Sequence, residues 1–269
     1  MRTPLSIIVV TFNTRDLTIR CIENFYDDAV AAGWEIISVD NGSADGTAQA
    51  VSARFPAVRV IRAEANRGYA AGANLGLGAS RGEVMILLNS DVLAPAGVLG
   101  ALREALLANP DIGAISPGLR TASGEPQPFA FGADPTLDYL LRRGWRTLRR
   151  RGFLHDWGVS EPIDVDWVSG ACLAVRAEVV RRVGPLDERF FLYFEDNDWC
   201  LRIRRAGYRV VYDPRWQVIH LGGASQPEGR AVNRVYQQSL LAFYAKHYGP
   251  LATAVLWLLL PVYNRLMRR

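Results

Sequence analysis

The run Leu5-Ser-Ile-Ile-Val-Val-Thr11 is short, apolar and β-branched, which is typical of a strand buried on both faces. The apolar residues of 16–28, just after it, recur at helical spacing. The same alternation continues along the chain. We expect strands at 34–39, 58–62, 83–88 and 112–116, and helices at 44–55, 69–80 and 95–108. Strands that alternate with helices through short loops predict an α/β sheet, mostly parallel, with helices on both faces.

The pattern changes after Pro117. Gly, Pro and Ser residues punctuate the chain as far as Gly132, and an Arg-rich segment follows. In the remainder we expect strands at 165–175, 208–212 and 216–220, helices at 177–183 and 195–206, and helical structure from about residue 229.

Composition describes an ordinary globular protein. Of the 269 residues, 49% are hydrophobic and 22% are charged, which excludes a disordered chain. Lys and Arg outnumber Asp and Glu by 31 to 27, a formal net charge of +4. The basic residues gather at two places: Arg142, Arg143, Arg146, Arg149, Arg150 and Arg151, then Arg265, Arg268 and Arg269. Because no aromatic-plus-basic RNA-binding signature accompanies them, we expect no nucleic-acid partner.

The cysteines indicate a reducing compartment. Cys21, Cys172 and Cys200 are widely spaced in apolar or helical contexts, which fits neither a disulfide framework nor a zinc site. We also expect no signal peptide, because the apolar run from Leu5 to Val10 is too short for one.

An aromatic run leads directly into three carboxylates in Phe190-Phe-Leu-Tyr-Phe-Glu-Asp-Asn-Asp-Trp-Cys-Leu-Arg202. Glu195, Asp196 and Asp198 would be normally solvated, but behind so apolar a run they are placed to form the floor of a site. A half-buried carboxylate has a raised pKa and can act as a general base. The alternative is an acidic helix N-terminus, which complements the macrodipole.

Polar residues follow four of the expected strands, in the segments 11–13, 40–43, 66–68 and 89–91. Ligands of open parallel sheets bind at the carboxyl ends of the strands, so these segments predict one shared polar crevice. Asp40 could accept a hydrogen bond from a base or ribose, and Gly42 and Gly46 would let the backbone approach a ligand. Asp91 suits Mg²⁺ or Mn²⁺ on a diphosphate. The alternative for each residue alone is a turn or cap.

His220 ends an expected strand. A lone histidine is more often structural, but beside a carboxylate-bound divalent ion it becomes a reasonable ligand. A P-loop and a dinucleotide-binding fingerprint are excluded, because neither glycine pattern follows the first strand.

Together these motifs resemble glycosyltransferase family 2, the inverting enzymes with the GT-A fold, over about residues 4–225. The matching segments are Val9-Val-Thr-Phe-Asn13, Val39-Asp-Asn-Gly-Ser-Ala-Asp-Gly-Thr47, Asn66-Arg-Gly-Tyr-Ala-Ala-Gly-Ala-Asn-Leu-Gly76, Leu87-Leu-Asn-Ser-Asp91, Trp167-Val-Ser-Gly-Ala171, Tyr193-Phe-Glu-Asp-Asn-Asp198 and His220. The resemblance implies a Rossmann-like sheet with additional C-terminal helices. Within the family, two of these blocks are most similar to bacterial rhamnosyltransferases that extend lipid-linked cell-surface glycans.

The resemblance also implies roles for single residues. Asp196 matches the catalytic base, while Asp91 and His220 match the ligands of a bound Mg²⁺ or Mn²⁺. The first Asp of the metal motif is replaced by Asn89, which is neutral and binds a cation more weakly. Expected nucleotide and donor contacts are Thr11, Phe12, Asn13, Asp40, Gly42, Asn66, Gly68, Asn74, Asn89 and Ser90. The acceptor region is expected at Trp167, Gly170, Glu195 and Asp198.

The implied reaction is the inverting transfer of a sugar from a nucleotide diphosphate, with dTDP-rhamnose as the expected donor. The acceptor would be a glycan or a polyprenyl-diphosphate-linked saccharide in cell-wall, O-antigen or exopolysaccharide synthesis. A UDP- or GDP-sugar donor is the alternative within the family. A sugar-1-phosphate nucleotidyltransferase is disfavoured because its Gly-rich basic loop is absent after the first strand. A non-catalytic glycan-binding or scaffold subunit is disfavoured because Asp91, Asp196 and His220 are all present.

The resemblance divides the chain at about residue 228. We expect a GT-A domain at 1–228, with a nucleotide-binding half at about 1–118 and an acceptor and catalytic half at about 119–228. A helical extension would occupy 229–269.

The apolar run 251–263 lies in this extension and is followed by Arg265, Arg268 and Arg269. Its length and Pro261 argue against a transmembrane helix, which needs about 20 apolar residues. One alternative is an interfacial helix with a basic flank, which makes the protein cytoplasmic and peripheral on the anionic inner face of the plasma membrane. The other is a helix docked on the domain or in a homodimer interface.

Overall fold

The computed structural model describes the backbone of residues 3–222 and 230–267, and the side chains of 3–222 and 234–261. Arg268 and Arg269, and the side chain of Arg265, lie outside the described part. In its first half strands and helices alternate as expected. The elements are β1 (Leu5–Thr11), α1 (Arg15–Glu23), α2 (Tyr26–Ala31), β2 (Glu35–Asp40), α3 (Thr47–Arg54), β3 (Val58–Arg62), α4 (Tyr69–Ala79), β4 (Val84–Asn89), β5 (Val92–Leu93), α5 (Ala96–Ala108) and β6 (Ile112–Arg120).

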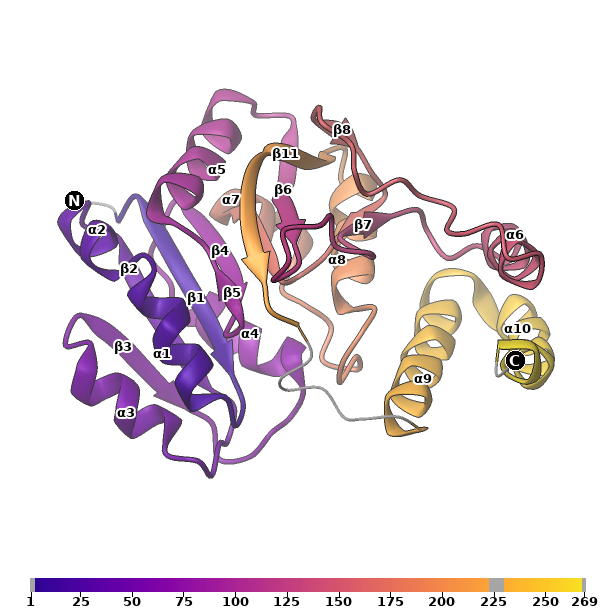
Figure 1. Cartoon of the computed structure of the whole chain (residues 1–269), viewed down its shortest axis with the longest axis horizontal. Helices are drawn as coiled ribbons and strands as arrows, with labels where there is room; N and C mark the ends of the chain where they lie inside the picture. The colour runs from indigo at the N-terminus through magenta and orange to yellow at the C-terminus, as the bar shows by residue number, and fades with distance from the viewer. Residues whose placement is uncertain (1–2, 223–229, 268–269) are drawn as a thin grey trace.

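The second half adds antiparallel strands and the helices at the far end of the molecule (Figure 1). Its elements are β7 (Phe131–Gly132), α6 (Leu137–Leu148), β8 (Ile163–Asp164), β9 (Trp167–Val168), β10 (Cys172–Arg176), α7 (Ala177–Val183), α8 (Glu195–Arg205), β11 (Arg209–His220), α9 (Arg230–His247) and α10 (Gly249–Met267).

One large sheet carries the fold, in the order β3-β2-β1-β4-β10-β6-β11-β5, with β8 paired to β11. The four strands β3, β2, β1 and β4 are parallel neighbours, and β6 and β11 are also parallel. Between these groups β10 runs antiparallel to both β4 and β6. The α/β class and the mostly parallel sheet are therefore confirmed, and β10 joins the two halves into one core.

Three expected elements differ in their bounds. The helix at 16–28 divides into α1 and α2, because Phe25 leaves helical geometry and buries its ring in the core. The strand at 165–175 is interrupted between β9 and β10, where backbone groups turn toward the site described below. The strands at 208–212 and 216–220 are one strand, β11, with a register shift between Asp213 and Gln217 that accommodates Pro214.

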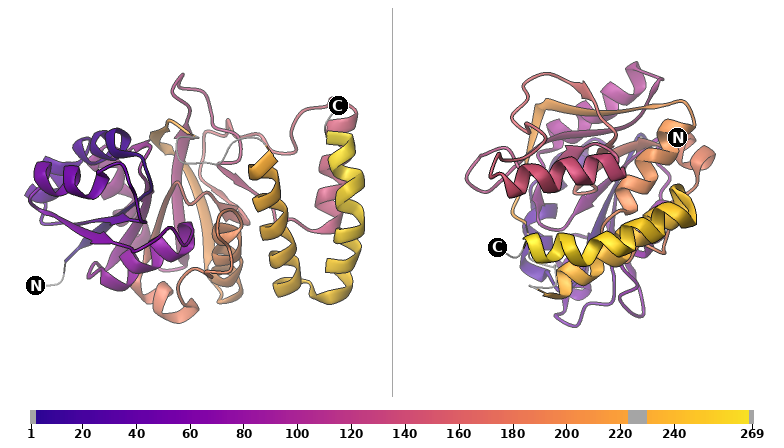
Figure 2. Two further views of the ribbon diagram at one scale, coloured as in Figure 1. Left: turned by 90° about the horizontal axis from the view of Figure 1, so that it is seen from below. Right: turned by 90° about the vertical axis from the view of Figure 1, so that its right-hand side faces the viewer.

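A second apolar core joins the C-terminal helices to the second half. Phe190, Phe194 and Leu201 pack with Leu240 and Phe243 of α9, and with Leu256 and Leu260 of α10. Helix α10 lies against both α9 and α6, and Figure 2 shows the three helices forming a layer at one end of the molecule. In the described residues, no helix combines the length and apolar character required to span a bilayer.

Candidate active site

The polar segments after β1, β2, β3 and β4 meet at one edge of the sheet. The strand register pairs Thr11 with Asp40, Asp40 with Arg62, and Val10 with Asn89. Parallel strands in this register end side by side, so 11–13, 40–43 and 89–91 form a common rim.

Hydroxyl groups hold the β1 end of this rim in place. Thr11 Oγ1 lies 2.9 Å from Thr14 Oγ1 and 2.7 Å from Thr18 Oγ1, and Thr14 Oγ1 lies 2.8 Å from Ser90 Oγ. All four side chains are buried. This internal network joins β1, α1 and the 89–91 segment, and the expected contacts of Thr11 and Ser90 with a nucleotide stay a prediction.

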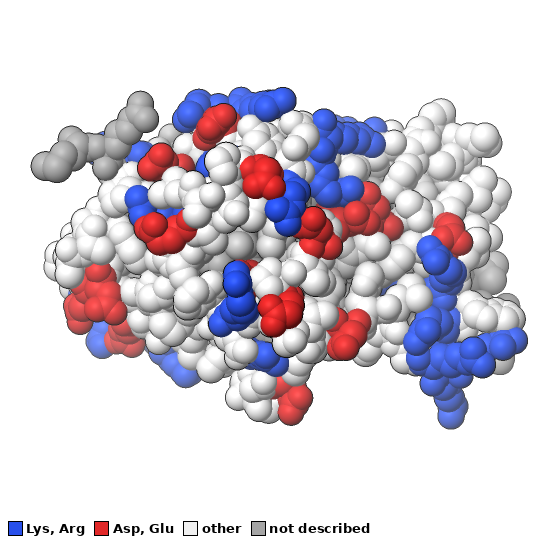
Figure 3. All heavy atoms as spheres, turned by 90° about the horizontal axis from the view of Figure 1, so that it is seen from above, with Lys and Arg blue, Asp and Glu red and all other residues white. Residues whose placement is uncertain are grey.

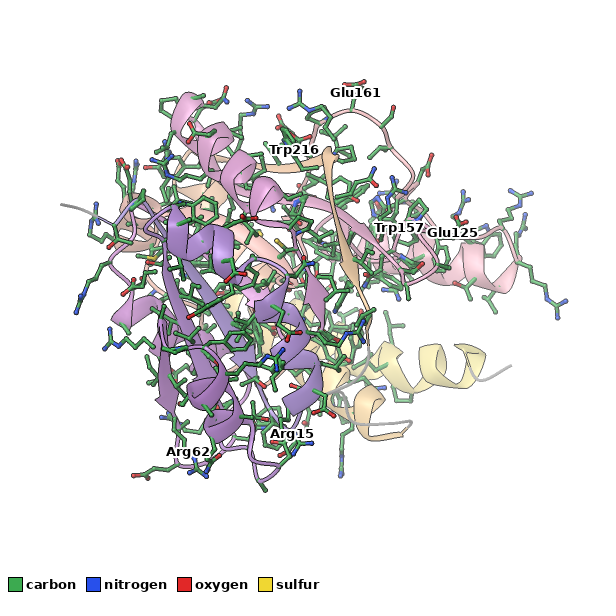
Figure 4. The ribbon with its side chains drawn as sticks, turned by 60° about the vertical axis from the view of Figure 1, so that its left-hand side comes forward. Arg15, Arg62, Glu125, Trp157, Glu161 and Trp216 are labelled. Atoms are coloured by element: carbon green, nitrogen blue, oxygen red, sulfur yellow. The ribbon has the colours of Figure 1, made fainter. Side chains whose placement is uncertain are left out.

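Asp40 organises the neighbouring loop from a buried position. Its Oδ1 accepts a hydrogen bond from Ser43 N at 2.8 Å, and its Oδ2 lies 3.9 Å from Nε of Arg62. Asn13 has a left-handed backbone, with φ 52°, and Ser43 Oγ accepts from its N–H at 2.9 Å. Arg62 and Arg15 lie at the same edge of the molecule (Figure 4). The half-buried Phe12 precedes this turn, so a nucleotide at the rim would meet a preformed loop with two arginines beside it.

The segment 66–68 is held by Asn41. The Asn41 Nδ2 group donates to Asn66 Oδ1 at 3.0 Å and to Gly68 O at 2.9 Å, and Gly68 N also donates to Asn66 Oδ1. A Cβ on Gly42 would lie 2.8 Å from the backbone of Ala65. Gly42 thus lets two segments of this chain approach each other, and the ligand approach expected of it stays a prediction.

Gly68 in turn positions the loop that carries the carboxylates. It has φ +92°, and a Cβ there would lie 2.4 Å from the carbonyl oxygen of Phe191. The same carbonyl accepts a hydrogen bond from Tyr69 N at 2.8 Å. Tyr193 and Phe194 follow with φ of 68° and 69°, a conformation that costs energy in non-glycine residues and is found at functional sites.

Asp196 and Glu195 begin α8 directly after this strained pair. Asp196 Oδ2 accepts from Gly170 N at 3.1 Å and Oδ1 from Asn197 N at 2.8 Å. Glu195 Oε2 is buried with no hydrogen-bond partner among the described residues. Burial raises the pKa of Asp196, and burial together with the adjacent Asp196 charge raises the pKa of Glu195 well above its ordinary value. Because Asp196 receives two N–H donors that stabilise its charged form, its pKa is raised less than that of Glu195, and Asp196 is the carboxyl of the pair that ionises more readily.

Asp91 directly precedes β5 and lies beside His220, the last residue of β11, because His220 pairs with Val92. His220 Nε2 is 3.2 Å from Asp91 Oδ1, and its Nδ1 is 3.0 Å from Oε1 of Gln127. The Gln127 amide thus holds Nδ1, with its Nε2 also 2.9 Å away, and leaves Nε2 of the ring facing the carboxylate. An imidazole nitrogen beside a carboxylate oxygen is a pair of ligands suited to a divalent ion. Within the described ranges, no three His, Cys, Asp or Glu residues gather as metal ligands. An ion here would complete its shell with water and diphosphate oxygens.

A cavity of about 910 Å³ brings the carboxylates of α8 together with Asn89 and His220. The sequence-predicted residues that line it are Asn89, Trp167, Gly170, Glu195, Asp196 and His220. Two lining residues, Tyr69 and Gln127, were not predicted. Tyr69 stands in the Asn66–Gly76 block quoted above, but its hydroxyl group donates to Gly170 O at 3.0 Å, and that partner lies 101 positions away in the sequence. Gln127 gives no signal in the sequence, because it lies in an irregular segment 93 positions from His220.

Two predicted residues lie elsewhere. Asp198 is fully buried away from the cavity and pairs with Arg202, Lys246 and His247, so its expected place in the acceptor region is wrong. Asn74 uses its amide to donate to Leu186 O at 2.9 Å and to accept from Leu186 N at 3.0 Å. It therefore fastens α4 to the 186–188 loop and is not positioned as a donor contact.

Solved structures share this fold. A mannosyltransferase from Pyrobaculum calidifontis, determined with GDP-Man and Mn²⁺, superposes with a TM-score of 0.59 at 19% identity, covering 97% of this chain and 81% of that one. GalNAc-T7 with UDP, GalNAc and Mn²⁺ superposes with a TM-score of 0.60 at 17% identity, covering 91% of this chain and 50% of that one. At these identities the likeness establishes the GT-A-like fold.

Relatives found by sequence include two rhamnosyltransferases. An N-acetylglucosaminyl-diphospho-decaprenol L-rhamnosyltransferase of Mycobacterium tuberculosis is 35% identical over 207 residues, which are 69% of this chain and 66% of the relative. The aligned part of the chain thus spans just under two thirds of that relative. Rhamnosyltransferase WbbL of Escherichia coli is 43% identical over 56 residues, 21% of each chain. The sequence model described as "Glycosyl transferase family 2" matches residues 6–148, just over half of the 269 residues. The chain belongs to glycosyl transferase family 2.

Proposed function

We propose that this chain is an inverting glycosyltransferase that moves L-rhamnose from dTDP-rhamnose to a hydroxyl of a lipid-linked saccharide in cell-surface polysaccharide synthesis. The observation that carries the reaction type is Asp196, a buried carboxyl group that accepts from two backbone N–H groups in the cavity that His220 and Asn89 also line. The rhamnosyl donor and the lipid-linked acceptor rest on the names of the mycobacterial and E. coli relatives.

The nucleotide donor and the acceptor would bind to different parts of the site. The rim formed by 11–13, 40–43, 66–68 and 89–91 would bind the nucleotide, with the nucleotide-binding half at about 1–118. The half at about 119–228 would bind the acceptor, and Trp167 and Gly170 border the carboxylates there. Tyr69, through its bond to Gly170 O, keeps that border in register with α4.

The chemical step needs one displacement. Asp196 accepts the proton of the acceptor hydroxyl while that oxygen attacks the anomeric carbon. The bond between this carbon and the diphosphate oxygen breaks, and nucleotide diphosphate leaves with the electron pair. Attack from the face opposite the leaving group inverts the configuration. General-base help of this kind contributes roughly 10²–10⁴-fold.

Asp91 and His220, with Asn89 beside them, would hold a divalent ion. Mg²⁺ and Mn²⁺ both accept such oxygen and imidazole ligands, and the ion supplies charge neutralisation for the departing diphosphate. Asn89 in place of a carboxylate leaves one negative charge fewer around the ion. We therefore propose binding that is weaker than in relatives with two carboxylates.

A donor panel would test this function. dTDP-rhamnose, UDP-sugars and GDP-sugars are each incubated with Mn²⁺ and a prenyl-diphosphate N-acetylglucosamine acceptor, and nucleotide diphosphate release is measured. We expect dTDP-rhamnose to be turned over fastest, and the product linkage, read by NMR, to have the configuration opposite to that of the donor. Retention would exclude the mechanism, faster turnover of a UDP- or GDP-sugar would exclude the donor, and no turnover of any donor would favour a non-catalytic subunit.

A further inference from the structure

The cavity that holds Asp196 continues far beyond the carboxylates. Its outer part runs between α6, α9 and α10 and is lined by leucines from all three helices: Leu140, Leu141 and Leu148 of α6, Leu240 of α9, and Leu259 and Leu260 of α10. A sugar would bind poorly against this wall, because its hydroxyl groups would lose hydrogen bonds with water and gain none from the leucines. The outer part, which we term the leucine groove, is suited to an apolar chain.

One charged side chain lies in this groove. Arg143 of α6 lines it, donates to Tyr236 Oη at 3.3 Å, and stacks over the Phe129 ring with its guanidinium carbon 5.3 Å from the ring centre. These contacts fix the guanidinium in the wall of the same cavity that the carboxylates and the leucines line. Guanidinium groups bind phosphate oxygens through paired N–H donors. The cavity therefore carries carboxylates, a cation and an apolar wall.

Two of the three helices that line the groove, α6 and α10, also expose apolar side chains at the end of the molecule. On α6, Leu141, Trp145 and Leu148 recur at i, i+4 and i+7 and are each at least half exposed, and on α10 Leu251, Trp257 and Leu258 are more exposed still. Lys and Arg side chains gather at this end of the surface (Figure 3), and the Arg149 guanidinium stacks on Trp145 with its carbon 4.1 Å from the ring centre. Apolar side chains rimmed by arginines are typical of a surface that lies in a headgroup layer.

We propose that the leucine groove holds the isoprenoid chain of a prenyl-diphosphate-linked saccharide and that Arg143 pairs with its diphosphate. The isoprenoid chain enters the groove from the bilayer between α6 and α10. The saccharide extends inward, so that its hydroxyl group reaches Asp196. This inference rests on the proposed function, because it presumes a saccharide acceptor at Asp196. It adds the subsite that selects a lipid-linked acceptor over a free glycan.

The test compares two acceptors with the full-length chain in detergent: N-acetylglucosamine on a long prenyl diphosphate, and the same sugar on a short water-soluble linker. The variants are Leu259→Glu and Arg143→Ala. Matched controls are Leu75→Glu, an exposed leucine on α4, and Arg142→Ala, an exposed arginine that pairs with Asp138. Leu259→Glu and Arg143→Ala should each lower the ratio of kcat/KM for the prenyl acceptor to kcat/KM for the soluble acceptor by about tenfold or more. The controls should leave this ratio unchanged.

A direct binding measurement separates this inference from the proposed function. Farnesyl diphosphate, added without donor, should quench tryptophan fluorescence through Trp145, and Leu259→Glu should weaken this binding. If the wild-type chain transfers sugar but neither binds farnesyl diphosphate nor favours the prenyl acceptor, the groove assignment is wrong and the transferase function stands. If it binds farnesyl diphosphate but transfers nothing, the lipid subsite stands and the reaction is wrong. A dimer that Leu259→Glu dissociates would overturn the proposal in favour of a second copy of the chain in the groove.

Discussion

His247 Nε2 of α9 lies 2.6 Å from Oδ1 of Asp198, two residues beyond the proposed catalytic base on α8. The same Asp198 oxygen lies 2.6 Å from Lys246 Nζ, and the other accepts from Arg202 Nε at 2.8 Å. Arg205 Nη1 lies 3.1 Å from His247 Nδ1 and can only donate, so the ring is neutral with its proton on Nε2. Helix α9 is thus fastened to α8 through a buried carboxylate, and the C-terminal helices are part of the site's support.

This contact predicts a pH dependence of stability. Burial lowers the pKa of His247, and the neighbouring Asp198 only partly opposes that effect. Below the ordinary histidine pKa of about 6.5 the unfolded chain therefore binds a proton that the folded chain does not, so the folded state loses stability as pH falls. The loss should reach at most about 1.4 kcal/mol per pH unit for one proton.

His247→Gln isolates this effect, since a Gln amide can donate to Asp198 and accept from Arg205 without titrating. Denaturant unfolding at pH 7.5, 6.5 and 5.5 should show the wild type losing stability relative to the variant as pH falls. A difference that is constant across this range would mean that His247 does not titrate in it.

Asp196→Asn should lower kcat for sugar transfer by roughly 10²–10⁴-fold. The affinity for the donor should stay within a few-fold of the wild type, because the base acts on the acceptor. Glu195→Gln is the matched variant. Burial and the adjacent Asp196 favour the protonated form of Glu195, which Gln resembles in charge and shape, so we expect most activity to remain. Comparable losses in both variants, measured as initial rates at pH 7.5, would show that the pair shares the role of base.

Asp91→Ala and His220→Ala should each raise the Mn²⁺ concentration needed for half-maximal activity and weaken nucleotide diphosphate binding. Both are expected to hold one ion. Gln127→Ala should have the same effect in milder form, because it releases the ring that it orients. Titration of the activity with Mn²⁺ would measure the half-maximal concentration, and isothermal calorimetry with dTDP would measure the affinity for the nucleotide diphosphate. Full activity of the wild type in EDTA would exclude a metal role for all three residues.

Gly68→Ala should be destabilising by about 1–3 kcal/mol, because a Cβ collides with the Phe191 carbonyl and φ is +92°. It should also lower kcat, since the 191–196 loop must move to relieve the collision. Gly78→Ala is the control: this exposed glycine of α4 has nothing within 4 Å of an added Cβ, so the change should stabilise the helix by about 0.5–1 kcal/mol. Thermal denaturation of both variants checks the difference, and a Gly68→Ala variant as stable as the wild type would refute the close approach.

Membrane attachment should depend on the exposed side of α10. Deleting residues 251–269 would not test it cleanly, because Leu256 and Leu260 belong to the second core. Trp257→Ser with Leu258→Ser removes two exposed apolar side chains and spares that core. We expect this variant to sediment less with anionic liposomes, and the wild type to bind less at high salt, since each Arg near the surface contributes about 1 kcal/mol. If the wild type fails to bind at either salt concentration, α10 serves a partner chain instead.

The strands and helices of the first half could be read from the sequence because their signals are local. Short β-branched runs, helical spacing and polar turns each lie within a few residues of one another, as in Leu5–Thr11 and Asp40–Ser43. The residues Asp91, Asp196 and His220 could be named because they stand in motifs that resemble a known family. The strands β5, β7 and β8 have two residues each, too few to show a periodic pattern. Helix α6 was not predicted, because its many arginines are equally typical of a solvated loop, although its leucines recur at helical spacing.

Long-range contacts account for the rest. Whether a polar side chain faces a ligand or another part of the chain depends on partners far away in sequence. Asn74 and Asp198 resembled site residues but bond to Leu186 and His247, which lie 112 and 49 residues away. The different roles of Glu195 and Asp196 follow from which carboxylate the Gly170 amide reaches across 26 residues. The leucine groove exists only because α10 packs against α6, a contact between segments more than 100 residues apart, and such pairings are set by packing and not by local preference.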